Sequence, residues 1–284
     1  MILIADSGST KTDWRLIDDE NKIHQFATQG ISPYFQSEEQ IFEIIKSELV
    51  SQLNFQILNV ELVIYFYGTG CSAEDKKQIV KNALSKNFIN SEIEIHSDML
   101  AAARALCGET AGIAAILGTG ANTCYYNGEK IIENKFSSGY ILGDEGSGAH
   151  IGKTFIQAYL NDELPSHLVN KFYERFKLSK DEIIDAVYRK PMPNRFLASF
   201  CKFIFQNKDD QYLIDLLVNC FEQFFDKHIC KYEKYKEVKL NCVGSIAFYF
   251  SDILRSVAAK KGVSIDVIIE TPIAALTLYH LREE

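Results

Sequence analysis

The sequence predicts an α/β protein of two domains, and an internal repeat is the main reason. Residues 1–30 have the pattern of an apolar strand, a turn of small polar residues, a second strand and a third strand. The same order returns from Gly112, where Asn127-Gly128 marks a tight hairpin. Each three-stranded set is followed by helices and further apolar strands, a pattern that builds a mixed sheet. We therefore expect two such domains, with a ligand-binding cleft between them.

The first half of the chain contains one copy of this pattern. Its strands are expected at 1–6, 12–18, 22–28, 60–66 and 92–96. A helix is expected near Glu38–Leu53, and another at Met99–Leu106 after the last strand. We place the first domain at 1–110, with the boundary near Cys107–Gly112.

The second half repeats the pattern with a helical insert. Its strands are expected from Ile113, on either side of Asn127-Gly128, from Val238 and at 264–269. Between about 145 and 235 apolar residues recur at helical spacing, and we interpret the many aromatic residues there as core. The second domain is expected to cover 111–269. A final helix, within about 270–284, is expected to pack back on the first domain.

Composition excludes several classes of function. The chain has 284 residues and a formal net charge of -8, so it has no electrostatic attraction to nucleic acid or to anionic membranes. No apolar run reaches the roughly 18 residues of a membrane span. The start, MILIADSG, has neither a basic region nor a cleavage site, so we expect no signal peptide.

Seven scattered cysteines without a C-x-x-C pair indicate reduced, buried thiols rather than disulfides or zinc ligands. Such cysteine usage is typical of a cytoplasmic protein.

The first turn is a candidate phosphate site. Small residues allow a phosphate to approach the backbone, and successive N–H groups and hydroxyls can surround it. The residues concerned are Ser7, Gly8, Ser9, Thr10, Lys11 and Thr12. Asp6, at the end of the preceding strand, could hold a hydrated Mg²⁺ beside that phosphate. The alternative is an ordinary polar hairpin turn.

A second turn of the same kind is Gly118-Thr119-Gly120. It is not a P-loop, because the required lysine is absent. Gly68-Thr69-Gly70 and Gly244-Ser245 also follow strands, and each alone is compatible with an ordinary strand-to-helix turn.

Two further places carry carboxylates that could do chemistry. Asp98 lies between a strand and a helix, where it could cap the helix or act as a general base at the strand end. Asp144 and Glu145 lie among four glycines, where they could cap a helix or accept hydrogen bonds from sugar hydroxyls. The lysine-rich run that begins at Lys227 is interpreted as a solvated helix face.

Taken in order, these motifs resemble those of the sugar kinase–heat-shock chaperone–actin superfamily, and more narrowly those of N-acetylglucosamine kinases. The motifs are Asp6–Thr12, Ser97-Asp98, Leu117–Asn122, Gly143–Ser147 and Val243–Ser245. The same family contains ATPase activators of benzoyl-CoA reductase and of hydroxyacyl-CoA dehydratases. The resemblance covers nearly the whole chain. It implies two ribonuclease-H-like domains of the actin-like ATPase type, with ATP, Mg²⁺ and a sugar bound in the cleft.

The resemblance also implies a role for each motif. Asp98 would be the base that takes the proton of the sugar 6-hydroxyl, and Asp6 would hold the metal. ATP would be bound by Ser7, Gly8, Ser9, Thr10, Lys11, Thr12, Gly118, Thr119, Gly120, Gly244 and Ser245. The sugar would be bound by Ser32, Gly68, Thr69, Asp98, Asn122, Gly139, Tyr140, Asp144 and Glu145.

One departure from the family pattern leaves the sugar open. The kinases carry an asparagine in the loop after the third strand, whereas this chain has Ser32 in that loop, so Ser32 or a backbone group must replace it. We expect an ATP-dependent kinase of an N-acetylated amino sugar, with N-acetylglucosamine first and N-acetylmuramate as the alternative. A non-kinase ATPase activator and a sugar sensor without catalysis are further alternatives, and a homodimer is left open.

Overall fold

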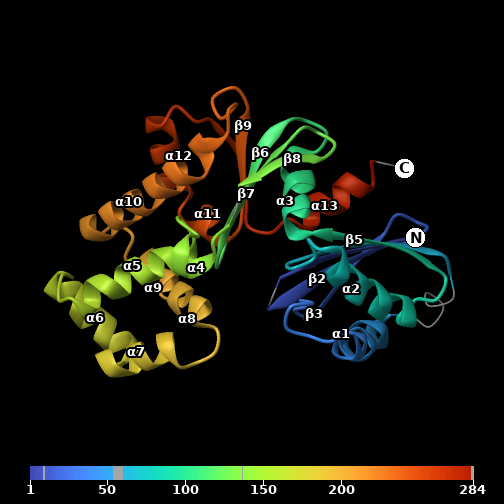
Figure 1. Ribbon diagram of the computed structural model, residues 1–284, viewed down its shortest axis with the longest axis horizontal. Helices are drawn as coiled ribbons and strands as arrows, with labels where there is room; N and C mark the ends of the chain where they lie inside the picture. The colour runs from blue at the N-terminus through green and yellow to red at the C-terminus, as the bar shows by residue number, and fades with distance from the viewer. Residues whose placement is uncertain (9, 54–59, 136, 283–284) are drawn as a thin grey trace. The chain divides into compact units, whose positions relative to one another are not determined.

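The computed structural model describes residues 1–8, 10–53, 60–135 and 137–282, and the chain divides into two compact units (Figure 1). Unit 1 comprises Met1–Gly108 and Pro272–Glu284, and unit 2 comprises Glu109–Thr271. Each unit contains a five-stranded sheet with both parallel and antiparallel neighbours. The predicted α/β fold class is confirmed.

The sheet of unit 1 has the strand order β3-β2-β1-β4-β5. Its strands are β1 (Ile2–Ser7), β2 (Lys11–Ile17), β3 (Ile23–Gln29), β4 (Leu62–Gly68) and β5 (Ser91–Ser97). The first three form an antiparallel meander, while β1, β4 and β5 are parallel. The carboxyl ends of these parallel strands therefore lie at one edge of the sheet.

Helices cover both faces of this sheet. They are α1 (Glu38–Ile44), the π-helical turn η1 (Ile45–Leu49), the 3₁₀ turn η2 (Val50–Gln52), α2 (Glu74–Asn87), α3 (Asp98–Cys107) and α13 (Ile273–His280). Figure 1 shows α1 and α2 on one side of the sheet and α3 and α13 on the other. Side chains alternate along β1 accordingly: Leu3 packs in the cluster with α1 and α2, and Ile4 packs in the cluster with α3 and α13.

The structure differs from the expected helices of unit 1 in two places. The helix expected at Glu38–Leu53 is α-helical only to Ile44, and it continues as η1 and η2. Glu48 on η1 accepts hydrogen bonds from the backbone and side-chain nitrogens of Gln29 at the end of β3, a tertiary contact that periodicity cannot reveal. Helix α2 was not expected, because few of its residues are apolar and its first residue follows Ala73, which supplies no side-chain cap.

Unit 2 repeats the topology of unit 1. Its sheet has the order β10-β9-β6-β7-β8, with β6, β7 and β8 antiparallel and β6, β9 and β10 parallel. The strands are β6 (Gly112–Leu117), β7 (Ala121–Tyr126), β8 (Ile131–Lys135), β9 (Lys239–Val243) and β10 (Ile265–Ile269). The repeat seen in the sequence is therefore a repeat of strand order and direction.

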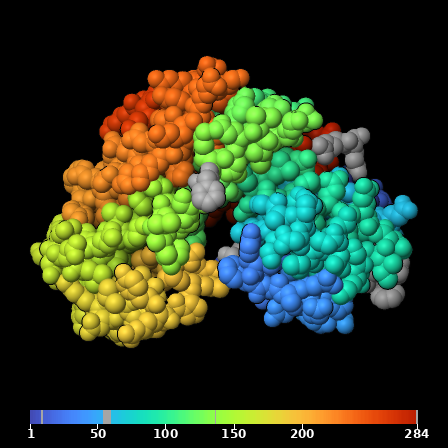
Figure 2. Space-filling view, in the orientation of Figure 1, coloured from blue at the N-terminus to red at the C-terminus, as the bar shows by residue number. Residues whose placement is uncertain are grey.

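The segment between β8 and β9 is helical, and it forms much of the visible surface of unit 2, from green-yellow to orange in Figure 2. Its elements are α4 (Gly139–Leu142), α5 (Gly148–Leu160), α6 (Ser166–Phe176), α7 (Lys180–Tyr188), α8 (Pro193–Ser199), α9 (Cys201–Gln206), α10 (Gln211–Lys227) and η4 (Ile229–Lys231). Two more helices, α11 (Ser245–Tyr249) and α12 (Ser251–Lys260), join β9 to β10.

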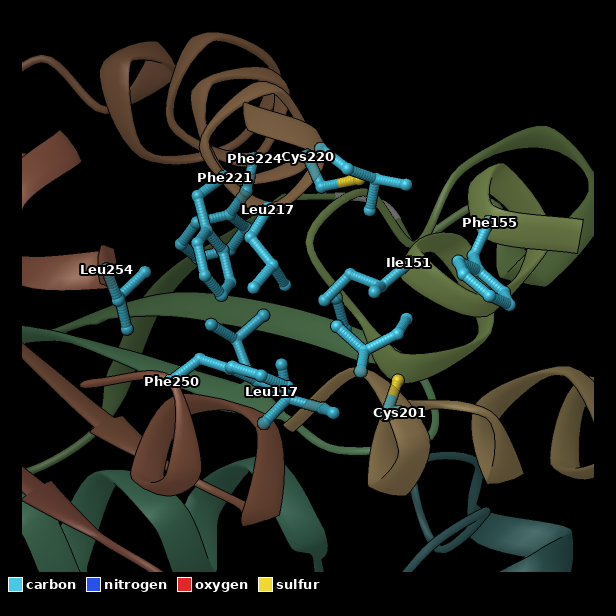
Figure 3. Packing of buried hydrophobic residues seen from close by; sticks show 14 of the residues in the cluster. Leu117, Ile151, Phe155, Cys201, Leu217, Cys220, Phe221, Phe224, Phe250 and Leu254 are labelled. Carbon is cyan, nitrogen blue, oxygen red and sulfur yellow. The ribbon is translucent and has the colours of Figure 1, made fainter. Parts of the chain in front are cut away.

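The aromatic residues of this segment form a core, as expected. Phe155, Phe221 and Phe224 are fully buried, and the strand residue Leu117 belongs to the same cluster (Figure 3). All seven cysteines are free thiols, and only Cys230 among them is more than marginally exposed. None of the helices in the described residues has the length and apolar character that a membrane crossing requires.

Candidate functional site

Unit 1 brings three of the predicted site residues to one sheet edge. Ser7, Gly68 and Ser97 lie side by side in the register of β1, β4 and β5. Thr69 and Asp98 directly follow Gly68 and Ser97, and Asp6 precedes Ser7 and lies close enough to Asp98 for that charge to raise its pKa. The backbone N–H of Thr69 donates to the carbonyl of Ser7 at 2.9 Å, which holds the loop after β4 against the end of β1.

Asp98 is oriented by the loop after β4 rather than used as a helix cap. Ser97 is the N-cap of α3, and its side chain accepts from the N–H of Leu100. The Asp98 carboxylate instead accepts a hydrogen bond from the Thr69 hydroxyl at 2.8 Å. Burial raises the pKa of Asp98, while the Thr69 bond and the N–H groups of Met99 and Asp98 work against that rise. The result is a carboxylate with a fixed direction and increased basicity, as a general base requires.

Asp6 lies beside this group in an electrostatically unfavourable position. Burial, then the negative charges of Asp98 and Asp13, raise its pKa to about 7. Among the described residues, no Lys, Arg or His forms an ion pair with Asp6, and no three His, Cys, Asp or Glu side chains form a metal-binding group. A hydrated Mg²⁺ is commonly held by one or two carboxylates and keeps its waters, so this residue fits such an ion.

The turn between β1 and β2 is held by buried hydroxyls. Ser7 Oγ lies 2.7 Å from Thr12 Oγ1, donates to the carbonyl of Ile31 and accepts from its N–H. Ser7 and Thr12 are fully buried, so their hydroxyls act inside the protein. The turn closes with the N–H of Gly8 donating to the carbonyl of Lys11 at 3.0 Å.

The tip of this turn faces solvent. Thr10 and Lys11 are exposed, and the Lys11 ammonium lies 2.6 Å from the Asp13 carboxylate. Of the residues in this turn that are predicted to bind phosphate, Thr10 and Lys11 have side chains exposed to solvent. The side chains of Ser7 and Thr12 are buried and hold the loop in its shape. Ser9 lies outside the described residues.

Ser32 lies in the loop after β3, and the structure places it near Gly70. Its side chain is buried, and its hydroxyl has no hydrogen-bond partner among the described residues. Gly70 has a φ of +87°, and a Cβ there would lie 2.6 Å from the Tyr34 ring and 3.5 Å from Ser32 Oγ. A buried hydroxyl without a partner costs about 1 to 3 kcal/mol, which a hydrogen bond from a ligand or a water molecule would recover.

In unit 2 the turn after β6 is held by backbone groups. The N–H groups of Gly148 and Ala149, at the start of α5, donate to the carbonyls of Gly118 and Thr119 at 2.8 and 3.0 Å. The exposed side chain of Thr119 lies at its tip. The N–H of Gly118 in turn donates to the carbonyl of Gly120. Because the start of α5 fixes this turn, its shape depends on the segment 143–148.

Gly244 lies against the same turn. It has a φ of +119°, and a Cβ there would lie 2.3 Å from the carbonyl oxygen of Leu117, so only glycine fits without movement. The next residue, Ser245, is exposed and begins α11. Two sequence motifs about 125 residues apart, the turn at Gly118–Gly120 and Gly244-Ser245, are thus brought together within unit 2.

Asp144 lies beside the turn of unit 2 with an uncommon backbone conformation, φ +55°. Its carboxylate accepts from the Ser137 hydroxyl at 3.0 Å, and a Cβ at Gly120 would lie 3.0 Å from its Oδ2. Burial raises the pKa of Asp144, and hydrogen bonds from the Ala121 N–H and from Ser137 oppose this. Neither Asp144 nor Glu145 caps α5, because Ser147 does.

Glu145 is buried and contacts two basic side chains. One carboxylate oxygen accepts from Lys227 Nζ at 2.7 Å, and the other lies 2.9 Å from His228 Nε2. Burial alone would raise the pKa of Glu145, but the hydrogen bonds from Lys227, from its own N–H and from His228 lower it to about 2. Lys227 is more than half exposed, as the interpretation of a solvated face requires, and the pairing of its ammonium with Glu145 is an additional contact. No local sequence signal links Glu145 to residues more than 80 positions away.

The other residues predicted for the sugar lie in two places of unit 2. Asn122 is on β7, and its side-chain oxygen accepts from the N–H of Thr123. Gly139 and Tyr140 begin α4, and the carbonyl of Tyr140 accepts from Lys153 Nζ at 3.1 Å. These positions as sugar ligands stay predictions.

The chain matches solved structures over its whole length. A crystal structure of a protein from Porphyromonas gingivalis, provisionally assigned as an N-acetylglucosamine kinase, is 40% identical, covers 99% of each chain and has a TM-score of 0.94. A protein from Chromobacterium violaceum with the same provisional assignment is 16% identical, with 98% of each chain covered and a TM-score of 0.75.

A ROK family glucokinase from Streptomyces griseus, in complex with glucose and AMPPNP, is 15% identical. The match covers 100% of this chain and 99% of that one, with a TM-score of 0.54. The Chromobacterium and Streptomyces matches show a shared fold. No family model and no curated protein matches the sequence.

Proposed function

The chain belongs to the family of sugar kinases represented by the Porphyromonas gingivalis protein, and from that membership we propose that it phosphorylates an N-acetylated amino sugar with ATP. N-acetylglucosamine is the first candidate substrate, because the relative at 40% identity carries that provisional assignment. The observation that carries the proposal is the Asp98 carboxylate, fixed by Thr69 at the sheet edge beside Asp6.

The proposed reaction needs few groups from the protein. The sugar 6-hydroxyl loses its proton to Asp98, and its oxygen bonds to the γ-phosphorus of ATP. The bond from the γ-phosphorus to the bridging oxygen breaks, and ADP leaves with that electron pair. Burial favours proton uptake by Asp98, and the Thr69 bond keeps the carboxylate from rotating away. The protein otherwise contributes positioning and compensation of charge.

Asp6 would hold the Mg²⁺ that neutralises the phosphate charges. The raised pKa of Asp6 supports this role, because a cation there would relieve the repulsion from Asp98 and Asp13. In unit 1 the tip of the first turn, with Thr10 and Lys11, would bind phosphate oxygens. In unit 2 the phosphate oxygens would be bound by Thr119 and the N–H groups of its turn. Gly244 and Ser245 would lie close to the adenosine.

N-acetylmuramate is the second candidate, and one contact favours it. Lys76 Nζ lies 5.3 Å from the centre of the Tyr34 ring, which packs over Gly70 next to Thr69. N-acetylmuramate carries a lactyl carboxylate at its 3-position, and a sugar bound along the loop at Gly70 would bring that carboxylate toward the Lys76 ammonium.

The decisive experiment measures ADP formation with ATP, Mg²⁺ and a panel of sugars: N-acetylglucosamine, N-acetylmuramate, N-acetylmannosamine and glucose. We expect the highest kcat/KM with an N-acetylated hexosamine, and phosphorus NMR should identify a 6-phosphate. N-acetylglucosamine lacking its 6-hydroxyl is the matched control and should inhibit without reacting. ATP hydrolysis independent of sugar would contradict the proposal, and so would sugar binding without turnover.

A further inference from the structure

A buried polar cluster joins three distant parts of unit 1 behind the candidate site. Tyr67 on β4 accepts a hydrogen bond from the Arg104 guanidinium on α3 at 2.6 Å. The same hydroxyl lies 2.9 Å from His280 Nε2 on α13. Tyr67 and His280 are almost completely buried. We call these three residues the Tyr67 cluster.

The chemistry of the cluster suits a fixed arrangement. Burial, then the positive charge of Arg104, lower the pKa of His280 to about 4, so its ring is neutral near pH 7. A neutral imidazole can accept the Tyr67 proton at Nε2 while Arg104 donates to the same oxygen. Stacking of Tyr65 on His280, with ring centres 3.9 Å apart, and of Arg104 over Tyr279 at 5.2 Å further restricts the side chains.

The cluster joins α3, which carries the proposed base, to β4, which leads to the Thr69 that orients it. Tyr67 is near the end of β4, two residues before Thr69 in the following loop. Arg104 is on α3, six residues after Asp98. Two bridges therefore span the same pair of elements, Thr69 to Asp98 and Tyr67 to Arg104. Six helical residues rise about 9 Å, so the bridges are well separated along the helix. Two separated bridges fix both the position and the tilt of α3 against β4.

We propose that Tyr67, Arg104 and His280 are positioning residues for phosphoryl transfer, which set the place of the Asp98 carboxylate through α3. This inference rests on the proposed function, because it presupposes that Asp98 is the base of the kinase reaction. The C-terminal helix α13, which supplies His280, is then needed for turnover although none of its residues belongs to the proposed reacting groups. Misplacement of a catalytic group by about 1 Å can cost 10²-fold in rate.

The test compares His280→Ala with a matched change on the same helix. Thr277 is also buried on α13, and in the described part of the chain its hydroxyl donates along the helix, to the carbonyl of Ile273 at 2.8 Å. We expect His280→Ala to lower kcat by roughly tenfold to 10²-fold with little change in the KM for ATP. Thr277→Val should leave kcat within about twofold of wild type, because the hydrogen bond that it removes is to Ile273 and not to a residue of the Tyr67 cluster.

Rescue separates positioning from general destabilisation. A glutamine oxygen can accept a hydrogen bond from Tyr67 near the place of Nε2, so His280→Gln should recover most of the lost kcat. Tyr67→Phe should lower kcat as His280→Ala does. If His280→Ala does not fold, these two variants carry the test. A normal kcat in any folded variant of the cluster, or an equal loss in Thr277→Val, would overturn the inference.

Hydrogen exchange tests the inference without activity. In His280→Ala we expect roughly tenfold faster exchange of the amides at the start of α3, such as Leu100, and no change in Thr277→Val. If the wild-type protein phosphorylates no sugar, the proposed function fails, and this exchange comparison alone decides whether the cluster holds α3. Unchanged exchange at Leu100 in His280→Ala would overturn the inference.

Discussion

The two units share a strand order but differ in the residues at equivalent places. Where β1 ends with Asp6 and Ser7 before its turn, β6 ends with Ile116 and Leu117. The strand that leads into the turn of unit 1 therefore ends with a carboxylate and a buried hydroxyl, whereas the strand that leads into the turn of unit 2 ends with apolar side chains, and backbone hydrogen bonds hold that turn. The two units share their architecture, but the carboxylates proposed for proton transfer and metal binding, Asp98 and Asp6, both belong to unit 1.

The two turns also depend on different kinds of residue. Side-chain bonds from Ser7 hold the first turn. Backbone hydrogen bonds from Gly148 and Ala149, and the close approach of Gly244 to the carbonyl of Leu117, hold the second. Substitutions in the two units should therefore have different consequences, chemical in unit 1 and structural in unit 2.

The strongest test of this division is Asp98→Asn. Asparagine keeps the size and can still contact Thr69, but it cannot take up the proton, so kcat should fall by roughly 10²–10⁴-fold. Sugar binding measured by calorimetry should stay close to wild type. Near-normal turnover in this variant would show that Asp98 is not the base, and it would contradict the chemical role assigned to unit 1.

In unit 2 the corresponding test is Gly244→Ala. The new Cβ would lie 2.3 Å from the carbonyl oxygen of Leu117 at a positive φ. We expect a loss of about 2 to 4 kcal/mol in the free energy of unfolding. Gly118→Ala is the matched control, because a Cβ there meets no atom within 4 Å, and it should cost less than about 0.5 kcal/mol. Denaturant unfolding measures both, and equal losses would contradict the steric argument.

Asp6 should make unit 1 less stable as the pH rises when no divalent cation is present. Its folded-state pKa is raised from 3.8 to about 7, so the folded protein holds this proton more tightly than the unfolded chain. Stability is therefore lost between pH 4 and pH 7. Asp6→Asn should be more stable than wild type by about 1 to 3 kcal/mol at pH 8 and equal to it near pH 4. Unfolding in the presence of a chelator, at both pH values, checks this.

The smallest expected effect is at Glu145. Its pKa is lowered to about 2, so its contribution to stability is present above pH 4.5 and is lost as the pH falls toward 2. Because Lys227 is more than half exposed, we expect Glu145→Gln to cost only about 1 to 2 kcal/mol at pH 7. The difference from wild type should shrink in acid. A difference that is independent of pH would mean that the carboxylate charge does not stabilise this cluster.

The sequence predicted the duplicated sheets because their alternation and turn residues are local signals. The meeting of Asp6, Thr69 and Asp98 could also be anticipated, since each follows or ends a parallel strand. Side-chain contacts between distant residues away from the strand ends could not be anticipated. The bond of Glu48 to Gln29 and the pairing of Glu145 with His228 depend on tertiary packing, and no spacing in the chain encodes either.

Unit 1 is interrupted in the sequence, since α13 is added after all of unit 2. On the ribosome, unit 2 can emerge and fold while unit 1 still lacks its last helix. A nascent chain stopped before residue 272 would display the proposed base without His280 to secure the helix that carries it. Emergence of α13 from the ribosome would then be the step that secures the proposed base.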